Sequence, residues 1–182
     1  LRLNLGVFVL HAVQLSLWMA VPALLERSGL PAAEHWKVYL PTVLLSFVVM
    51  GGGLFRLERR GYMRAVFLCA ISMIAAAQAG FLLLQGQPTL WPLALLLCLF
   101  FIGFNTLEAS QPSLTSRIAP PAHRGTALGV YNTAQSLGLF VGGGLGGWLS
   151  KAAGAPGVFG MALVLTLLWL SVAWRMPALA RN

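Results

Sequence analysis

The chain has 182 residues, of which 58% are hydrophobic and only 9% are charged, and its mean hydropathy is +0.81. Soluble domains carry about 25% charged residues, so this composition excludes an ordinary soluble domain and predicts a membrane protein. The net charge is +8, but the basic residues lie in short clusters between apolar runs, without the interleaved aromatic residues of a nucleic-acid-binding stripe. We therefore expect no nucleic-acid partner.

Apolar runs separated by short polar breaks recur along the whole chain. An α-helix needs about 20 residues to cross the ~30 Å of hydrocarbon in a bilayer. Lipid cannot satisfy exposed backbone groups, so such runs must be helical, and they are too long for the ~10-residue strands of a membrane barrel. The sequence predicts an all-α, polytopic membrane protein with one bundle over residues 1–182. Its six transmembrane helices are predicted at residues 3–25, 38–55, 65–84, 91–115, 125–149 and 157–174.

The first run, residues 3–25, exceeds the ~7–15 apolar residues of a signal-peptide core and has no clear small-x-small cleavage site. We interpret it as a spanning helix. The chain begins with Leu1 and has no initiator Met, so we expect it to be part of a longer protein. His11 on this run is a candidate for proton chemistry because imidazole titrates near neutral pH. The alternative is a hydrogen-bonded packing residue.

Arginines and lysines in the breaks predict the orientation of these helices. Cytoplasmic loops carry an excess of both residues. Nine basic residues fall on one side and three on the other, and both termini are therefore predicted in the cytoplasm of a bacterial inner membrane. The nine are Arg2, Arg56, Arg59, Arg60, Arg64, Arg117, Arg124, Arg175 and Arg181, and the three are Arg27, Lys37 and Lys151.

The fourth run places Glu108, one of only four acidic residues, among apolar side chains. A carboxylate at the bilayer centre costs at least ~2.5 to 3.5 kcal/mol, and such residues normally face a bundle interior or water. A low-dielectric environment also favours a carboxyl group that takes up and releases a proton. We predict a proton-coupling role for Glu108. The alternative is a hydrogen-bonded brace near Pro112, where a backbone hydrogen bond is lost.

Polar residues at helical spacing mark one face on each of three predicted helices. Spacings of three, four and seven place residues on one side of a helix, and we expect the three faces to line one wet cavity. Buried amides also join helices by hydrogen bonds, which is the alternative role of Gln14, Gln111 and Gln135. The marked residues are Asn4, His11, Gln14 and Trp18; Asn105, Glu108, Gln111 and Thr115; and Tyr131, Asn132 and Gln135. The third and sixth helices are poor in such residues and are expected to face lipid.

The fifth run is rich in glycine. Gly138, Gly142, Gly143 and Gly146 recur at the small-xxx-small spacing that lets a neighbouring helix approach closely. We predict that they pack against another helix, with bending at these glycines during a conformational cycle as the alternative.

Enzyme chemistry is not indicated by the sequence. It contains no paired carboxylates, no Ser/His/Asp set and no P-loop. The two cysteines, Cys69 and Cys98, match no metal or redox spacing. We expect no enzyme, no metal and no cofactor, with a proton gradient as the driving force.

The break between the second and third runs contains Glu58, Arg59, Arg60 and Gly61, in the order acid, Arg, any residue, Gly. This order resembles a degenerate copy of G-x-x-x-[DE]-R-x-G-[RK]-[RK], the cytoplasmic loop motif of the major facilitator superfamily. Leu54 stands at the first Gly of the motif, and the closing basic pair is replaced. The resemblance implies that Glu58, Arg59 and Gly61 form a gating loop whose charge contacts hold one gating state.

The stretch from Phe104 to Trp148 is similar to the corresponding region of bacterial inner-membrane efflux transporters of this superfamily, and the opening RLNLGVFVLHAVQLSLWMAVP is similar to their seventh helix. The resemblance implies the C-terminal half of a twelve-helix fold, built from two inverted three-helix repeats. Its partners would be the lipid bilayer, an absent N-terminal half of six helices and a small-molecule substrate.

Two functions follow from this resemblance and from the residues. The first is proton-coupled efflux of a small or drug-like molecule by alternating access. The alternative is a stand-alone six-helix scaffold, or a dimerising module that uses the glycine-rich face, without transport.

Overall fold

The apolar runs form long helices. The computed structural model describes residues 2–175, apart from the side chain of Arg59, and these residues contain no β-strand, so the predicted all-α class is confirmed for them. The α-helices are α1 (Arg2–Trp18), α2 (Val21–Arg27), α3 (Trp36–Val49), α4 (Phe55–Leu57), α5 (Met63–Leu83), α6 (Leu90–Ile118) and α7 (Arg124–Trp174). Short 3-10 turns η1 (Ala32–Glu34) and η4 (Pro121–His123) and the π-helical segments η2 (Met50–Leu54) and η3 (Glu58–Tyr62) connect them.

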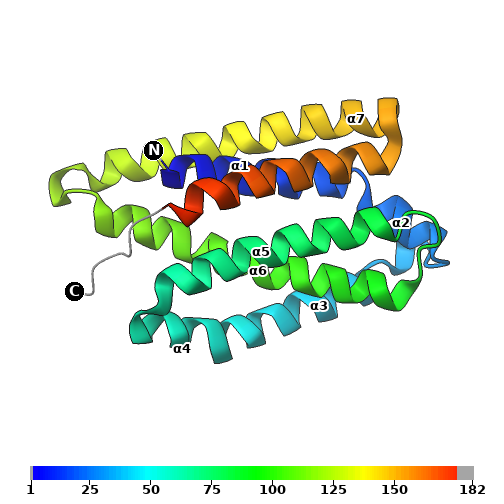
Figure 1. Cartoon of the computed structure of the whole chain (residues 1–182), viewed down its shortest axis with the longest axis horizontal. Helices are drawn as coiled ribbons and strands as arrows, with labels where there is room; N and C mark the ends of the chain where they lie inside the picture. The colour runs from blue at the N-terminus through cyan, green and yellow to red at the C-terminus, as the bar shows by residue number, and fades with distance from the viewer. Residues whose placement is uncertain (1, 176–182) are drawn as a thin grey trace.

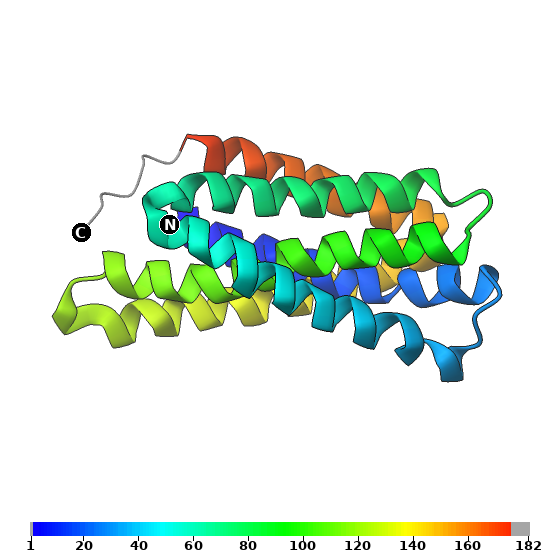
Figure 2. The same ribbon diagram turned by 90° about the horizontal axis from the view of Figure 1, so that it is seen from below.

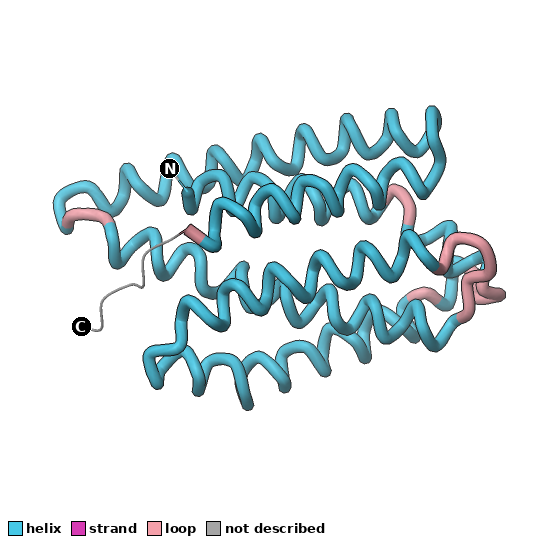
Figure 3. Tube along the Cα trace, viewed as in Figure 1, coloured by secondary structure: helices cyan, strands magenta, loops and turns pink. Residues whose placement is uncertain are grey.

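Five helical segments within residues 2–175 are long and apolar enough to cross a membrane. They cover Arg2–Arg27, Ala32–Leu57, Arg60–Leu83, Leu90–Ile118 and Pro121–Trp174. Each of the six predicted runs falls within one of these segments, to within one residue. The helices run alongside one another, and the loops that join them lie at the two ends of the bundle (Figure 3).

The last segment differs in form from the two separate helices predicted at residues 125–149 and 157–174. Helical hydrogen bonding continues through Lys151, and the backbone leaves helical geometry at Gly154, where φ is 66° and ψ is −167°. Figure 1 shows the chain reversing direction there, so that α7 has a first arm, residues 124–153, and a second arm, residues 155–174. The expected break is short because lysine and alanine favour helix, whereas Gly154 adopts the positive φ and Pro156 follows it.

The first predicted helix, residues 3–25, is interrupted. α1 ends at Trp18, and α2 begins at Val21 with Pro22 in its first turn. Proline has no backbone N–H and is accommodated at a helix start but not in a helix interior. The second predicted helix likewise widens into η2 and η3, and Gly61 with φ of 94° ends the second of these.

Helix packing brings segments that are distant in the sequence together. α1 packs along α7, α5 packs against both α6 and α7, and α3 packs against α6. Figure 2 shows α3 crossing the outside of the bundle at an angle to α6. α3 is the least buried of the spanning segments, and it exposes Leu44, Leu45 and Val48. α5 is about half buried, so the third helix is less peripheral than its composition predicted.

Glycines on the first arm of α7 allow it to lie directly on the backbone of α1. A Cβ added to Gly138 would meet the carbonyl oxygen of Phe8, and one added to Gly142 would meet that of Ala12. A Cβ on Gly146 would lie 2.7 Å from the Cα of Ser16. Gly143 differs, because it faces only the side chain of Leu15, at 3.1 Å. Three successive turns of α7 therefore rest on three successive turns of α1.

Two arginines join the end of α7 to the starts of α1 and α5. Arg2 donates to the carbonyl oxygen of Arg175 at 2.7 Å, and Arg64 donates to that of Trp174 at 2.6 Å. The last carbonyls of a helix lack intrahelical partners, and the C-terminal end carries partial negative charge. The two guanidinium groups provide hydrogen bonds to these carbonyls and positive charge near this helix end. The end of α7 and the starts of α1 and α5 therefore meet at one end of the bundle.

The packing of α1 on α7 predicts that a larger side chain destabilises the protein at some glycines of α7 and not at others. Gly142→Val should lower the stability of the protein by about 1 to 3 kcal/mol, the usual cost of overpacking, because its side chain would overlap the backbone of Ala12. Gly144→Val is the matched control, since no atom lies within 4 Å of a Cβ placed there. Thermal unfolding in detergent measures the difference, and equal melting temperatures for the two variants would contradict the close approach of the helices.

Candidate polar site

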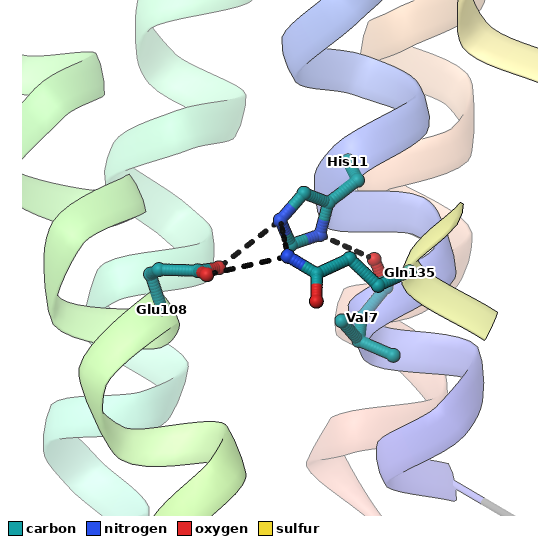
Figure 4. Close-up of polar contacts among 4 residues, drawn as sticks. All are labelled: Val7, His11, Glu108 and Gln135. Carbon is teal, nitrogen blue, oxygen red and sulfur yellow. Dashed lines mark hydrogen bonds and ion pairs between the residues drawn. The ribbon is translucent and has the colours of Figure 1, made fainter. Parts of the chain in front are cut away.

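Three polar side chains from three helices meet inside the bundle. They are His11 of α1, Glu108 of α6 and Gln135 of the first arm of α7 (Figure 4). Nε2 of His11 lies 3.1 Å from Oε2 of Glu108. Nε2 of Gln135 lies 2.8 Å from Nε2 of His11 and 3.4 Å from Oε1 of Glu108. We call these three residues the polar triad.

The ring of His11 is fixed on both of its sides. It is 3% exposed, and its Nδ1 lies 2.9 Å from the carbonyl oxygen of Val7, one turn earlier in α1. Phe104 meets it edge to face, with ring centroids 5.8 Å apart. A carbonyl oxygen only accepts hydrogen bonds, so the hydrogen is assigned to Nδ1, and Nε2 is the atom that faces Glu108 and Gln135.

Glu108 lies at a point in α6 where a backbone hydrogen bond is missing. The carbonyl oxygen of residue 108 would normally accept from the N–H of residue 112, but Pro112 has none. The Glu108 side chain is 37% exposed, whereas that of His11 is 4% exposed. The Glu108 side chain is therefore partly exposed, but the oxygen that faces His11, Oε2, is buried, as is the imidazole.

The triad has the chemistry of a proton-binding site. An imidazole nitrogen and a carboxylate oxygen face one another, and either can hold a proton that the other accepts. Tyr131 of α7 is 2% exposed, and its hydroxyl group has no hydrogen-bond partner among the described residues. Within residues 2–175, no three His, Cys, Asp or Glu side chains lie together in a way that could hold a metal ion.

The other residues predicted for the cavity are placed differently. Asn105 donates from Nδ2 to Oγ of Ser46 at 2.7 Å, which links α6 to α3. Gln111 is fully buried, and its amide has no hydrogen-bond partner among the described residues. Gln14 is half-buried, and Asn132 is exposed on the outer side of α7. The amides of the three helices therefore do not converge on one point.

The predicted gating loop forms η3. Oγ of Ser110 donates to Oε2 of Glu58 at 3.3 Å, two residues along α6 from Glu108. Gly61 has a positive φ, which the turn into α5 requires. Arg59 lies on η3, but its side chain is outside the described part of the structure.

Two partners of the predicted site, Ser46 and Ser110, were not identified from the sequence. Serine is common in membrane helices, where its hydroxyl usually bonds to its own backbone, as Ser46 does to Val43. Neither serine therefore stands out by composition or spacing, and only the packing of α3 and η3 against α6 reveals these hydrogen bonds.

Long apolar helices that enclose a few polar side chains define an α-helical membrane protein. Comparison with protein families gives a match to the Major Facilitator Superfamily over residues 3–181. The chain belongs to this superfamily, a family of transporters, which confirms the family resemblance noted in the sequence.

Individual relatives agree with this assignment. The chain is 40% identical to the inner membrane transport protein YajR of Escherichia coli K12 over 173 residues, which are 95% of this chain and 38% of the relative. It is 33% identical to the multidrug resistance protein MdtH of Photorhabdus laumondii, over 68% of this chain and 30% of the relative. MdtH of Salmonella schwarzengrund is 28% identical over 92% of this chain and 43% of its own length. The chain therefore spans less than half the length of these relatives.

The link between Asn105 and Ser46 predicts a measurable coupling between α6 and α3. In a double-mutant cycle with Asn105→Ala and Ser46→Ala, we expect a coupling energy of about 0.6 kcal/mol and at most about 1.7, the range measured for hydrogen bonds between membrane helices. Unfolding of the protein in mixed micelles gives the four free energies. Ser72→Ala replaces Ser46→Ala in the control cycle, because the Ser72 hydroxyl bonds only within α5, and equal coupling in both cycles would contradict the link.

Proposed function

We propose that the chain is the C-terminal half of a twelve-helix secondary transporter that exports a small, drug-like molecule in exchange for protons. The observation that carries this proposal is the His11–Glu108 pair, 3.1 Å apart across two helices. Proton uptake by such a pair changes the net charge at the contact between two helices by one unit, which biases a transporter between two arrangements. The multidrug resistance relatives support efflux of drug-like compounds.

We infer that the chain forms six transmembrane helices. The last spanning segment has 54 residues, more than twice the length that one crossing needs. Its reversal at Gly154 makes each arm of α7 long enough to be a span. The bundle then contains the first to third and the fourth to sixth helices as two groups.

An inverted repeat of these two groups is supported by which helices pack together. α1, the first helix, packs along α7, and its close approach is to the first arm, the fifth helix. α6, the fourth helix, packs against α3, the second. Exchange of the two groups converts one of these pairs into the other, as a repeat requires.

The orientation and the partners form part of the same proposal. The arginine-rich end of the bundle, where Arg2 and Arg64 meet the end of α7, is placed in the cytoplasm of a bacterial inner membrane. The exposed apolar side chains of α3 are covered by lipid or by the N-terminal six-helix half. Glu58 and Ser110 hold one gating state, and the driving force is the proton gradient without a bound cofactor.

A scaffold or dimerising module without transport is less well supported. In that alternative, the glycine-rich face of α7 packs against a second chain. In the structure, Gly138, Gly142 and Gly146 of α7 already pack against α1 of the same chain.

Transport measurements test the proton-coupling role of Glu108. In inverted membrane vesicles that contain the full-length protein, a proton gradient should drive substrate uptake between about pH 6 and about pH 8, the range in which imidazole titrates. Glu108→Gln keeps the size and removes the titration, so uptake should fall to the level of vesicles without the protein. Glu34→Gln is the control, because Glu34 is exposed and pairs only with Lys37. Unchanged uptake with Glu108→Gln, at normal membrane insertion, would make Glu108 a brace.

Side-specific labelling tests the six-helix topology. In a cysteine-free background, Lys151→Cys should react with an impermeant maleimide added outside the cell, and Arg124→Cys should react only after the cytoplasmic side is exposed. The two positions lie at opposite ends of the first arm of α7. Labelling of both residues from the same side would contradict the proposed topology.

A further inference from the structure

The amide of Gln135 lies between the two groups of the triad that can exchange a proton. Its nitrogen is 2.8 Å from Nε2 of His11 and 3.4 Å from Oε1 of Glu108. An amide nitrogen carries two hydrogens and no available lone pair. One nitrogen can therefore donate to both groups at once, provided that both are acceptors.

Both groups are acceptors only when the pair holds no shared proton. Nδ1 of His11 keeps its hydrogen for the carbonyl oxygen of Val7, so Nε2 of the neutral ring has a lone pair, and the ionised carboxyl group of Glu108 has only lone pairs. Without a donor between them these groups would face one another unpaired. The two N–H groups of Gln135 supply that donor in the geometry of Figure 4.

Uptake of one proton by the pair removes one of the two acceptors of Gln135, Nε2 of His11, and leaves the other, Oε1 of Glu108. If the proton is on Nε2 of His11, it points at Oε2 of Glu108, 3.1 Å away, and the ring no longer accepts from Gln135. If the proton is on the carboxyl group, it occupies the same lone pair of Nε2. In a reversed amide, the oxygen would accept from the ring but would also face the carboxyl oxygens, which are acceptors.

Gln135 lies between a part of α7 with no buried side chains and a part that packs closely against α1. Beyond Gln135, Gly138 rests on the backbone of α1. Before it, none of the residues 121–130 is buried, and Tyr131 is the first buried side chain of the helix. Between residue 121 and Gly138, Tyr131 is thus the buried side chain of α7, and Gln135 is the residue that makes hydrogen bonds to α1 and α6.

We propose that Gln135 is a positioning residue that holds the first arm of α7 against both α1 and α6 when the His11–Glu108 pair is unprotonated, and that loses its hold on α1 when the pair takes up a proton. This inference rests on the proposed proton-coupled function. The titratable side chains in contact with the amide are His11 on α1 and Glu108 on α6, and Tyr131 precedes Gln135 by four residues, about one turn, on α7 itself. Glu58 on η3 is the next acidic group, through Ser110. A tyrosine phenol keeps its proton near neutral pH, so the pair is the group that changes.

Distances between spin labels in the full-length protein test the release. Labels are attached to cysteines at Val130 of α7 and Leu5 of α1, both exposed, after Cys69 and Cys98 are replaced by serine. In the wild-type background the distance should be longer at about pH 5.5 than at about pH 8.5, on either side of the ordinary titration range of imidazole. A distance that does not change with pH overturns the proposal.

Substitutions at Gln135 then separate a proton-dependent hydrogen bond from ordinary packing. Gln135→Leu should remove the pH dependence, because leucine makes no hydrogen bond. Gln135→Glu, of nearly the same size, should reverse its sign, because a carboxylate offers acceptors and is held only when the pair carries a proton. Ser136→Ala is the control, since that hydroxyl bonds within α7, and it should retain the wild-type response. A wild-type change of the distance with pH in Gln135→Leu overturns the proposal. If Gln135→Leu fails to fold, a change of the wild-type sign in Gln135→Glu overturns it instead, and a reversed sign supports it.

The transport measurement on Glu108→Gln distinguishes this inference from the proposed function. Abolished coupled transport in Glu108→Gln, together with a retained pH response in Gln135→Leu, overturns only the role of Gln135. Unimpaired coupled transport in Glu108→Gln, together with an abolished response in Gln135→Leu, overturns only the proposed function.

Discussion

The packing of backbone on backbone between α1 and the first arm of α7 sets the distance between His11 and Gln135, on which the polar triad depends. Gly138 and Gly142 meet the carbonyl oxygens of Phe8 and Ala12, the residues on either side of the turn that carries His11. At this separation a single amide on α7 can reach an imidazole on α1 and a carboxyl group on α6 together. Larger side chains at the two glycines would separate the helices and pull the triad apart. The glycines therefore contribute to the site although they offer it no chemistry.

The second constraint is the cost of a carboxyl group within apolar surroundings, at least ~2.5 to 3.5 kcal/mol for an ionised group at the bilayer centre. Three features of the structure reduce it for Glu108. The Glu108 side chain remains 37% exposed, the imidazole of His11 lies beside its carboxyl group, and Gln135 donates an N–H group to it. Gln111, one turn further along α6, has no such help, since its fully buried amide lacks a partner within the described residues. The same helix thus contains one polar group that is accommodated and one that is not.

Hydropathy and helical spacing predicted the long helices and selected His11, Glu108 and Gln135 as candidates, because both signals depend on the properties of a single helix. Which faces meet depends on tertiary packing, so the sequence could not predict that these three converge while Asn105 turns to Ser46 and Asn132 stays exposed. The predicted helix boundaries were wrong where the local helix-forming or helix-breaking properties of residues differed from what their hydropathy indicated. The interruption between Trp18 and Val21 was not predicted because the residues around it are apolar. The first arm of α7 extends to Gly154, beyond the predicted end at residue 149, because the residues between them favour helix.

The arginine hydrogen bonds at the end of α7 have a mechanical consequence. Arg2 and Arg64 fix the last carbonyls of the second arm to the starts of α1 and α5, so that end of α7 cannot shift without breaking two charged hydrogen bonds. The first arm, by contrast, rests on α1 through its glycines, and its opening residues 121–130 are not buried. The two arms of α7 are therefore held differently: the second arm is fixed at its last residues by charged hydrogen bonds, and the first arm is held by backbone packing in its middle. Before Tyr131, the first arm has no buried side chain and is joined to α6 through η4.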